Sequence, residues 1–151
     1  MKTIEGDLIE LAKAGRFDVM VHGCNCFGTM GAGVAKAIAT SFPQALAVDR
    51  ATPLGERAKL GIVSIAEVDL QDHRLTVVNA YTQFDYRGRG VKVDYDALRL
   101  CFERVAEMFP GARIGYPMIG AGLAGEDWSI IEVIIDEALE ALDHTLILLR
   151  T

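Results

Sequence analysis

Two glycine-rich stretches of this sequence hold the side chains best suited to chemistry. In the first, His22 and Asn25 precede three closely spaced glycines, and in the second a glycine run at residues 120–125 precedes Asp127. Imidazole has an ordinary pKa of about 6.5 and suits proton transfer at neutral pH, while a carboxylate can orient or deprotonate water. Glycine lets a backbone approach a ligand closely. The two stretches therefore predict a binding site that has acid–base groups at its edge.

Each of these side chains also has a purely structural explanation. A histidine on a buried strand, as expected for His22, is commonly a hydrogen-bonded core residue. Asn25 suits a turn, because asparagine tolerates the left-handed backbone conformation. Asp127 directly precedes a helical pattern, where an aspartate caps the helix N-terminus or interacts with its dipole. At the level of sequence both sets of roles stay open.

Alternating strands and helices are expected to position the two stretches. The first follows an apolar strand at 19–22 and precedes helical spacing at 34–42, and the second lies between a strand at 113–118 and a helix at 129–142. In a parallel sheet, such loops lie at the carboxyl ends of the strands, where open α/β sheets bind ligands. The helix N-termini would offer unpaired N–H groups that suit phosphates. We therefore predict two facing loops that bind a ligand with two phosphates.

The rest of the chain is expected to complete one α/β domain over residues 1–151. Two β-branched runs, at 62–66 and 75–80, can form a hairpin, which would make a mainly parallel sheet mixed. Helices are expected on both faces of this sheet. The other predicted elements are a first strand ending at Ile4, helices at 8–14, from Pro43 and at 94–108, and a final strand at 145–149.

Composition narrows the class of protein. The chain has 21 acidic and 15 basic residues, a formal charge of −6 and no cluster of Lys or Arg, so we expect no generic binding to nucleic acid or membranes. It has no signal-peptide pattern and an odd number of cysteines, which favours a cytoplasmic protein without disulfides. Cys24 and Cys26 are interpreted as small apolar loop residues, with zinc binding beside His22 as the alternative. We predict no metal site and no cofactor.

Residues 120–125 also match the G-x-G-x-x-G pattern of dinucleotide-binding folds. That fingerprint requires a following strand that ends in an acidic residue about 20 positions further on. The next predicted strand ends at Arg150, and the acidic residues nearby precede it. The dinucleotide-binding interpretation is therefore rejected.

Four ordered segments resemble the macrodomain family over nearly the whole chain. They are Gly6-Asp7-Leu8, the first glycine stretch at 22–33, the Tyr-x-x-Leu sequence at 95–98 and the second glycine stretch at 119–125. The resemblance implies a three-layer α/β/α sandwich around a mixed, mainly parallel sheet, with ADP-ribose or a derivative as ligand. The His-Gly-Cys-Asn-Cys sequence at 22–26 most resembles the branch that hydrolyses ADP-ribose 1″-phosphate to ADP-ribose and phosphate.

This resemblance implies roles for individual residues. Asp7 would accept a hydrogen bond from the adenine amine, although an aspartate there is also a good helix N-cap. Asn25 would hold the distal ribose, and His22 and Asp127 would act on the terminal phosphate or on its attacking water; these three form the predicted catalytic set. The other predicted ligand contacts are Leu8, Gly28, Met30, Gly31, Ala32, Gly33, Val34, Ile119, Gly120, Ala121, Gly122, Leu123, Ala124 and Gly125.

Two other functions stay open. One glycohydrolase branch of the family uses a lysine nucleophile in the loop after the central strand, but here Gln83 takes that place and Lys92 lies nearer the next helix. Removal of ADP-ribose from protein or nucleic acid is therefore the second hypothesis. A non-catalytic ADP-ribose reader is the third. The expected partner is ADP-ribose or its 1″-phosphate, bound by a monomer.

Overall fold

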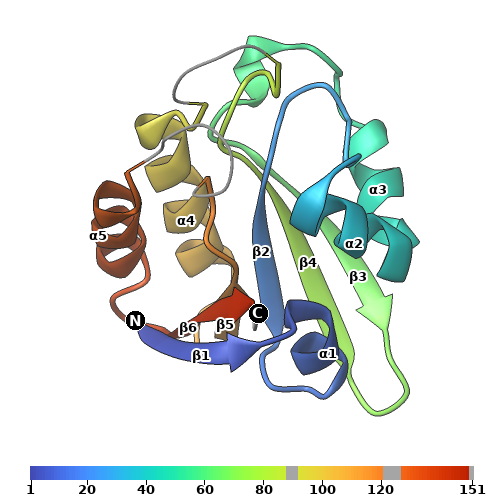
Figure 1. Cartoon of the computed structure of the whole chain (residues 1–151), viewed down its shortest axis with the longest axis vertical. Coiled ribbons are helices and arrows are strands. Elements are labelled where there is room, and N and C mark those ends of the chain that lie inside the picture. The colour runs from blue at the N-terminus through green and yellow to red at the C-terminus, as the bar shows by residue number, and fades with distance from the viewer. Residues whose placement is uncertain (88–91, 121–126, 150–151) are drawn as a thin grey trace.

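A mixed β-sheet runs through the centre of the molecule (Figure 1). The computed structural model describes residues 1–87, 92–120 and 127–149 of the 151-residue chain. Over these residues the sheet has six strands in the order β1-β6-β5-β2-β4-β3, and neighbouring strands are parallel except for the antiparallel hairpin of β3 and β4. The predicted mixed sheet is thus confirmed. Its strands are β1 (Lys2–Gly6), β2 (Val19–Cys24), β3 (Val63–Asp69), β4 (Arg74–Tyr81), β5 (Arg113–Tyr116) and β6 (Asp143–Leu149).

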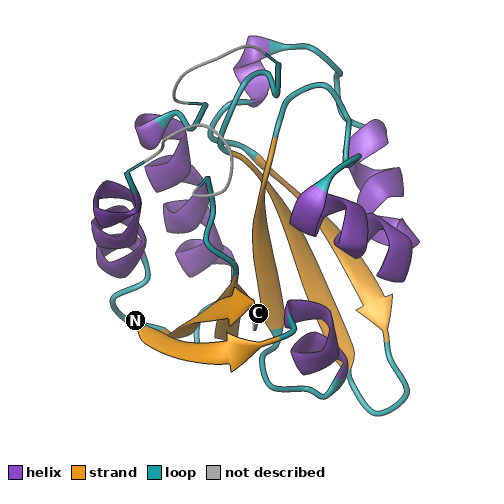
Figure 2. Ribbon diagram, viewed as in Figure 1, coloured by secondary structure: helices purple, strands orange, loops and turns teal. Residues whose placement is uncertain are grey.

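Helices cover both faces of the sheet, as Figure 2 shows, so the predicted three-layer α/β/α sandwich is confirmed. Helices α1 (Leu8–Lys13), α2 (Gly33–Ser41) and α3 (Pro43–Arg50) pack on one face, and α4 (Tyr95–Met108) and α5 (Trp128–Ala138) pack on the other. A short 3-10 helix, η1 (Arg57–Lys59), precedes β3. None of the described helices is long and apolar enough to cross a membrane.

Local sequence explains most of these elements. Helix α4 begins at an N-cap, Asp94, whose carboxylate accepts a hydrogen bond from the Ala97 amide at 2.9 Å. Its buried stripe repeats at helical spacing, and Pro110 and Gly111 follow its end. Burial of this stripe against the sheet supplies the hydrophobic stabilisation that a helix of this length needs in water. The stripe consists of Ala97, Leu98, Cys101, Phe102 and Val105.

Element ends differ from the predictions by a few residues. Strand β1 continues past Ile4 to Gly6, because its parallel pairing with β6 extends that far. Strand β5 ends at Tyr116, directly before Pro117, which lacks the N–H that a ladder needs. Helix α5 ends at Ala138 rather than near Leu142. These ends depend on pairing partners and packing that are distant in the sequence.

The neighbouring strands β2 and β5 are parallel, and the segments that follow them cross to opposite faces of the sheet. After β2 the chain enters α2 and α3 on one face and later forms β4 beside β2, whereas after β5 it enters α5 on the other face and forms β6 on the far side. Ligands of open α/β sheets bind where strand order reverses in this way. The carboxyl ends of β2 and β5, which both predicted ligand loops follow, therefore form the switch point of the fold.

Candidate functional site

The loop from β2 to α2 is organised by the side chain of Asn25. Its amide Nδ2 donates to the hydroxyl and the carbonyl of Thr29 at 2.8 and 3.1 Å, and its Oδ1 accepts from the amide of Phe27 at 2.8 Å. The side chain is therefore fully engaged in shaping the loop, which is the turn role that the sequence left open. Contact between Asn25 and a ribose stays a prediction.

Two glycines of this stretch, Gly28 and Gly33, have a positive φ, which favours glycine. Gly28 has a φ of +72°, and a Cβ atom there would lie 2.6 Å from Cδ2 of Leu54. Gly31 differs, because a Cβ at that position would have no neighbour within 4 Å and its φ is not positive. The space beside Gly31 is therefore open, as a residue facing a ligand requires.

The N-terminus of α2 is suited to an anion. Its N-cap, Ala32, has no side chain that could accept a hydrogen bond, and no acidic residue lies in the first turn. Residues 31–34 are exposed, including the side chain of Val34 at 42%. The first amides of a helix lack intrahelical acceptors, so here they are available to a phosphate.

The N-terminus of α5 is already occupied by a carboxylate. Asp127 caps this helix, and its Oδ1 accepts from the amide and the hydroxyl of Ser129 at 2.9 and 2.5 Å. These hydrogen bonds lower the pKa of the Asp127 carboxyl, which is exposed and therefore ionised at neutral pH. The two helix ends are thus different in charge. The α2 end suits a phosphate, and the α5 end suits the orientation of a water molecule or a hydroxyl group.

Asp7 lies at the carboxyl end of β1, on the same edge of the sheet. It caps α1, where its Oδ1 accepts from the Glu10 amide at 2.9 Å. Its other oxygen, Oδ2, accepts no hydrogen bond from the described residues and remains available to an adenine amine. Of the second loop, Ile119 is buried and Gly120 has a φ of +73°; the predicted contacts from Ala121 to Gly125 lie outside the described residues.

His22 lies inside the core, where its exposed fraction is 1%. The Asn79 amide is oriented by its Nδ2, which donates to the carbonyl of Ala45 at 3.0 Å. The Oδ1 of Asn79 therefore faces His22 and accepts from the ring atom Nε2 at 2.7 Å. This contact assigns the proton of the neutral His22 ring to Nε2. Burial lowers the pKa of His22 to about 4. The ring is therefore neutral at pH 7 and anchored to β4. A catalytic role for His22 stays a prediction, and its described contacts are structural.

We expect protein stability to fall in mild acid because of His22. Its pKa is about 4 when folded and 6.5 ordinarily, so between these values the unfolded chain binds more protons than the native protein. The stability due to neutral His22 is complete above the higher value and is lost as pH falls towards the lower one, by about 3 kcal/mol in all. Urea unfolding at several pH values measures this loss, and His22→Gln should make it smaller. Equal pH dependence in both proteins would contradict the assignment.

Several polar residues at this edge were not identified from the sequence. Thr82 is 1% exposed, and its hydroxyl has no hydrogen-bond partner among the described residues. A Cβ atom at Gly23 would lie 2.8 Å from that hydroxyl and 2.9 Å from Cγ2 of Ile119. The three residues therefore meet where β2, β4 and the β5 loop converge. No motif marks Asn79 or Thr82, because their neighbours come from distant segments.

The cysteines behave as apolar residues. Cys24, Cys26 and Cys101 are free and buried, and burial raises the pKa of each thiol. Thiolate is the nucleophilic form, so these groups are poor nucleophiles at neutral pH. In the described parts of the chain, no three His, Cys, Asp or Glu side chains are grouped as metal ligands would be.

Comparison with known proteins identifies relatives that span this chain. An uncharacterised 17.5 kDa protein of phage T4 is 36% identical over 97% of this chain and 95% of its own length. A DNA ADP-ribosyl glycohydrolase of Mycobacterium tuberculosis is 27% identical over 83% of this chain, which matches 36% of that protein. The chain thus corresponds to about a third of the glycohydrolase. The sequence matches no protein family model.

Solved structures agree with the architecture. A macrodomain protein from Streptomyces coelicolor is 26% identical, with a TM-score of 0.71 over 97% of each chain. Thermosipho africanus DarTG, solved in complex with ADP-ribose, is 17% identical, with a TM-score of 0.74 over 99% of this chain and 42% of its own. The second similarity concerns the fold alone, and it covers less than half of that protein.

Proposed function

We propose a function from one premise, that this chain is a macrodomain protein and belongs to the family of the 17.5 kDa phage T4 protein. On this basis we infer that it binds ADP-ribose at the carboxyl edge of β2 and β5 and hydrolyses the bond between ADP-ribose and an acceptor. The observation that carries the proposal is that the chain crosses to opposite faces of the sheet after these two parallel strands, with an uncapped helix N-terminus on one side and an ionised aspartate on the other.

In the proposed complex, backbone groups bind the diphosphate. The exposed amides at the start of α2 can donate hydrogen bonds to phosphate oxygens without a basic patch, and the open space beside Gly31 leaves room for the phosphates. This explains how a chain of charge −6 can bind an anion. The free oxygen of Asp7 is proposed to accept a hydrogen bond from the adenine amine, which would leave the distal ribose near the loops after β2 and β5.

Asp127 is proposed to act on water. Its ionised carboxylate would accept a proton from a water molecule whose oxygen bonds to C1″ of the distal ribose. The bond from C1″ to the acceptor would break, and the proton would pass to the acceptor. Gln83 has no nucleophilic side chain, and its amide donates to the Asp85 carbonyl at 3.5 Å. The proposal therefore uses direct attack by water rather than a covalent lysine intermediate.

Hydrolysis of ADP-ribose 1″-phosphate is the second candidate. The His-Gly-Cys-Asn-Cys sequence at 22–26 favours it, since it resembles the phosphatase branch. In the structure, however, His22 is buried and hydrogen-bonded to Asn79, so Asp127 is the one exposed group of the pair expected to act on the terminal phosphate. For this reason it ranks below release of ADP-ribose from an acceptor. That reaction is also supported by the similarity of this chain to the mycobacterial glycohydrolase.

Asp127→Asn is expected to lower kcat for release of ADP-ribose by about 100-fold or more, because asparagine cannot take the proton. Asparagine still caps a helix well, so folding and ADP-ribose affinity should change little. The assay supplies ADP-ribosylated DNA, ADP-ribosylated protein and ADP-ribose 1″-phosphate separately and measures ADP-ribose or phosphate released.

Asp94→Asn is the matched control, because Asp94 also caps a helix but is not among the residues proposed to bind or act on ADP-ribose. It should leave the rate unchanged. Release of phosphate alone, from the 1″-phosphate alone, would favour the second candidate. Tight binding of ADP-ribose without turnover of any substrate would make the protein a reader. Absence of ADP-ribose binding would contradict the proposal as a whole.

A further inference from the structure

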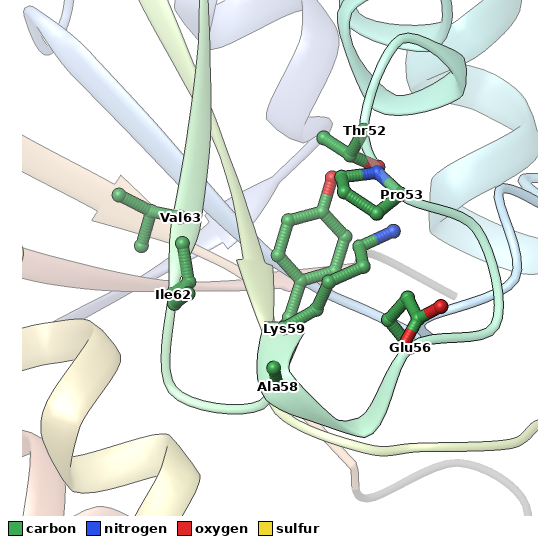
Figure 3. A pocket seen from close by; sticks show the side chains of 8 residues that line it. Thr52, Pro53, Glu56, Ala58, Lys59, Ile62 and Val63 are labelled. Atoms are coloured by element: carbon green, nitrogen blue, oxygen red, sulfur yellow. The ribbon is translucent and has the colours of Figure 1, made fainter.

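A separate cavity of about 380 Å³ lies between the 3-10 helix η1 and the start of β3 (Figure 3). This volume is in the range of small-molecule sites. None of the predicted ADP-ribose contacts lines it. Its walls include Pro53, Ala58, Lys59, Ile62, Val63 and Tyr81.

Most of the cavity wall is apolar and includes one rigid aromatic ring. Figure 3 shows Lys59 with Pro53 on one side and Ile62 and Val63 on the other. The ring of Tyr81 also lines the cavity, next to Lys59. The Tyr81 hydroxyl donates to Asp49 Oδ1 at 2.7 Å and lies 2.8 Å from the Ser64 hydroxyl, so the ring is held in place. A planar apolar group fits such walls better than a flexible polar one does.

Lys59 places a cationic group at this apolar wall. The side chain is 4% exposed, its Nζ lies 4.3 Å from the centre of the Tyr81 ring, and it donates to the Cys26 carbonyl at 3.2 Å. Among the described residues no carboxylate forms a direct ion pair with Lys59; Asp49 accepts from Tyr81 and attracts Lys59 only at longer range, and Glu56 at the cavity wall is exposed to solvent. An anion that accepts a hydrogen bond from Lys59 in the cavity would pair directly with this buried cation.

The backbone of the first ligand loop is hydrogen-bonded to a side chain of the cavity wall. The Cys26 carbonyl accepts hydrogen bonds from Lys59 Nζ and from the Gly55 amide, the latter at 2.7 Å. Lys59 therefore contacts the backbone of this loop directly. Because of this contact, substitution of Lys59 also disturbs the loop, and a test needs a second variant that leaves Lys59 intact.

We propose that this cavity is a second binding site, for a planar aromatic ring that carries an anionic group. The ring would pack among Tyr81, Pro53 and Ile62, and the anion would accept a hydrogen bond from Lys59. Two sources share this chemistry, a nucleoside monophosphate and an aromatic carboxylate. The inference does not depend on ADP-ribose turnover.

The test measures binding of uridine monophosphate and benzoate by calorimetry and by methyl chemical shifts of Ala58, Ile62 and Val63. Saturating ADP-ribose is present in one series and absent in the other. We expect at least one probe to bind in both series, and its uncharged analogue, uridine or benzamide, to bind at least tenfold more weakly. Binding of one probe alone identifies the source of the ligand.

Two variants locate the binding. Ala58→Trp fills the cavity from an exposed position and should abolish binding, whereas Ala141→Trp, at another exposed alanine far along the chain, should not. Lys59→Met should weaken binding at least tenfold, with Lys59→Arg retaining most of it. The proposal is overturned if neither probe binds, if ADP-ribose displaces the bound probe, or if Ala58→Trp binds as well as the parent protein. A separate ADP-ribose titration reports on the proposed function independently.

Discussion

Asn79→Ala is expected to lower the free energy of unfolding by about 4 kcal/mol, a large part of the roughly 5–15 kcal/mol typical of a domain. The reason is that one fully buried side chain bonds to three segments. Its Oδ1 accepts from His22, and its Nδ2 donates to the Ala45 carbonyl and to the Ser64 hydroxyl. Alanine would leave the His22 N–H buried without a partner, at a cost of about 1–3 kcal/mol. It would also remove the hydrogen bonds to Ala45 and Ser64, at about 1 kcal/mol each.

Urea unfolding measures this loss, with Gln71→Ala as the control at an exposed turn position. A double variant, His22→Leu with Asn79→Leu, should lose less than the sum of the two single variants, because it removes both ends of one hydrogen bond. Losses below about 1 kcal/mol for Asn79→Ala, or strict additivity in the double variant, would contradict the proposed network.

Gly31→Asp is expected to weaken ADP-ribose binding by about thirtyfold without destabilising the fold. A carboxylate there would face the bound diphosphate, and repulsion between charges a few ångströms apart near a protein surface is worth about 2 kcal/mol or more. The side chain itself has room, since a Cβ atom at Gly31 meets nothing within 4 Å and φ is not positive. Calorimetric titration with ADP-ribose gives the affinity, and thermal unfolding checks the fold.

Gly31→Ala is the matched control, because it adds the Cβ atom without the charge and should bind ADP-ribose nearly as the parent does. Added salt should narrow the difference between the aspartate and alanine variants, since it screens exposed charges. Equal affinity in the two variants would mean that the phosphates lie elsewhere. Equal loss in both would assign the effect to shape rather than to charge.

Much of the fold follows from local sequence. Apolar spacing predicts α4, β-branched runs predict the β3–β4 hairpin, and both are confirmed. The order of strands and loops, read together with the Gly-Asp-Leu and glycine-loop motifs, predicts the macrodomain fold, which the solved relatives support. These features were accessible because periodicity and turn residues act over a few positions along the chain.

Tertiary structure decided the environment of each chemical group. His22 has the residue type of a proton-transfer group, but packing against β4 removes it from water and lowers its pKa to about 4. Asn25 has two polar groups, and the folded loop uses both of them. Lys59 carries no motif, yet the fold buries it beside an apolar cavity. Burial and hydrogen bonding depend on partners that are distant in the sequence; His22 and Asn79 lie 57 residues apart. The sequence by itself therefore determined the elements and the edge where they meet, and only the tertiary structure decided which side chains at that edge remain available for chemistry.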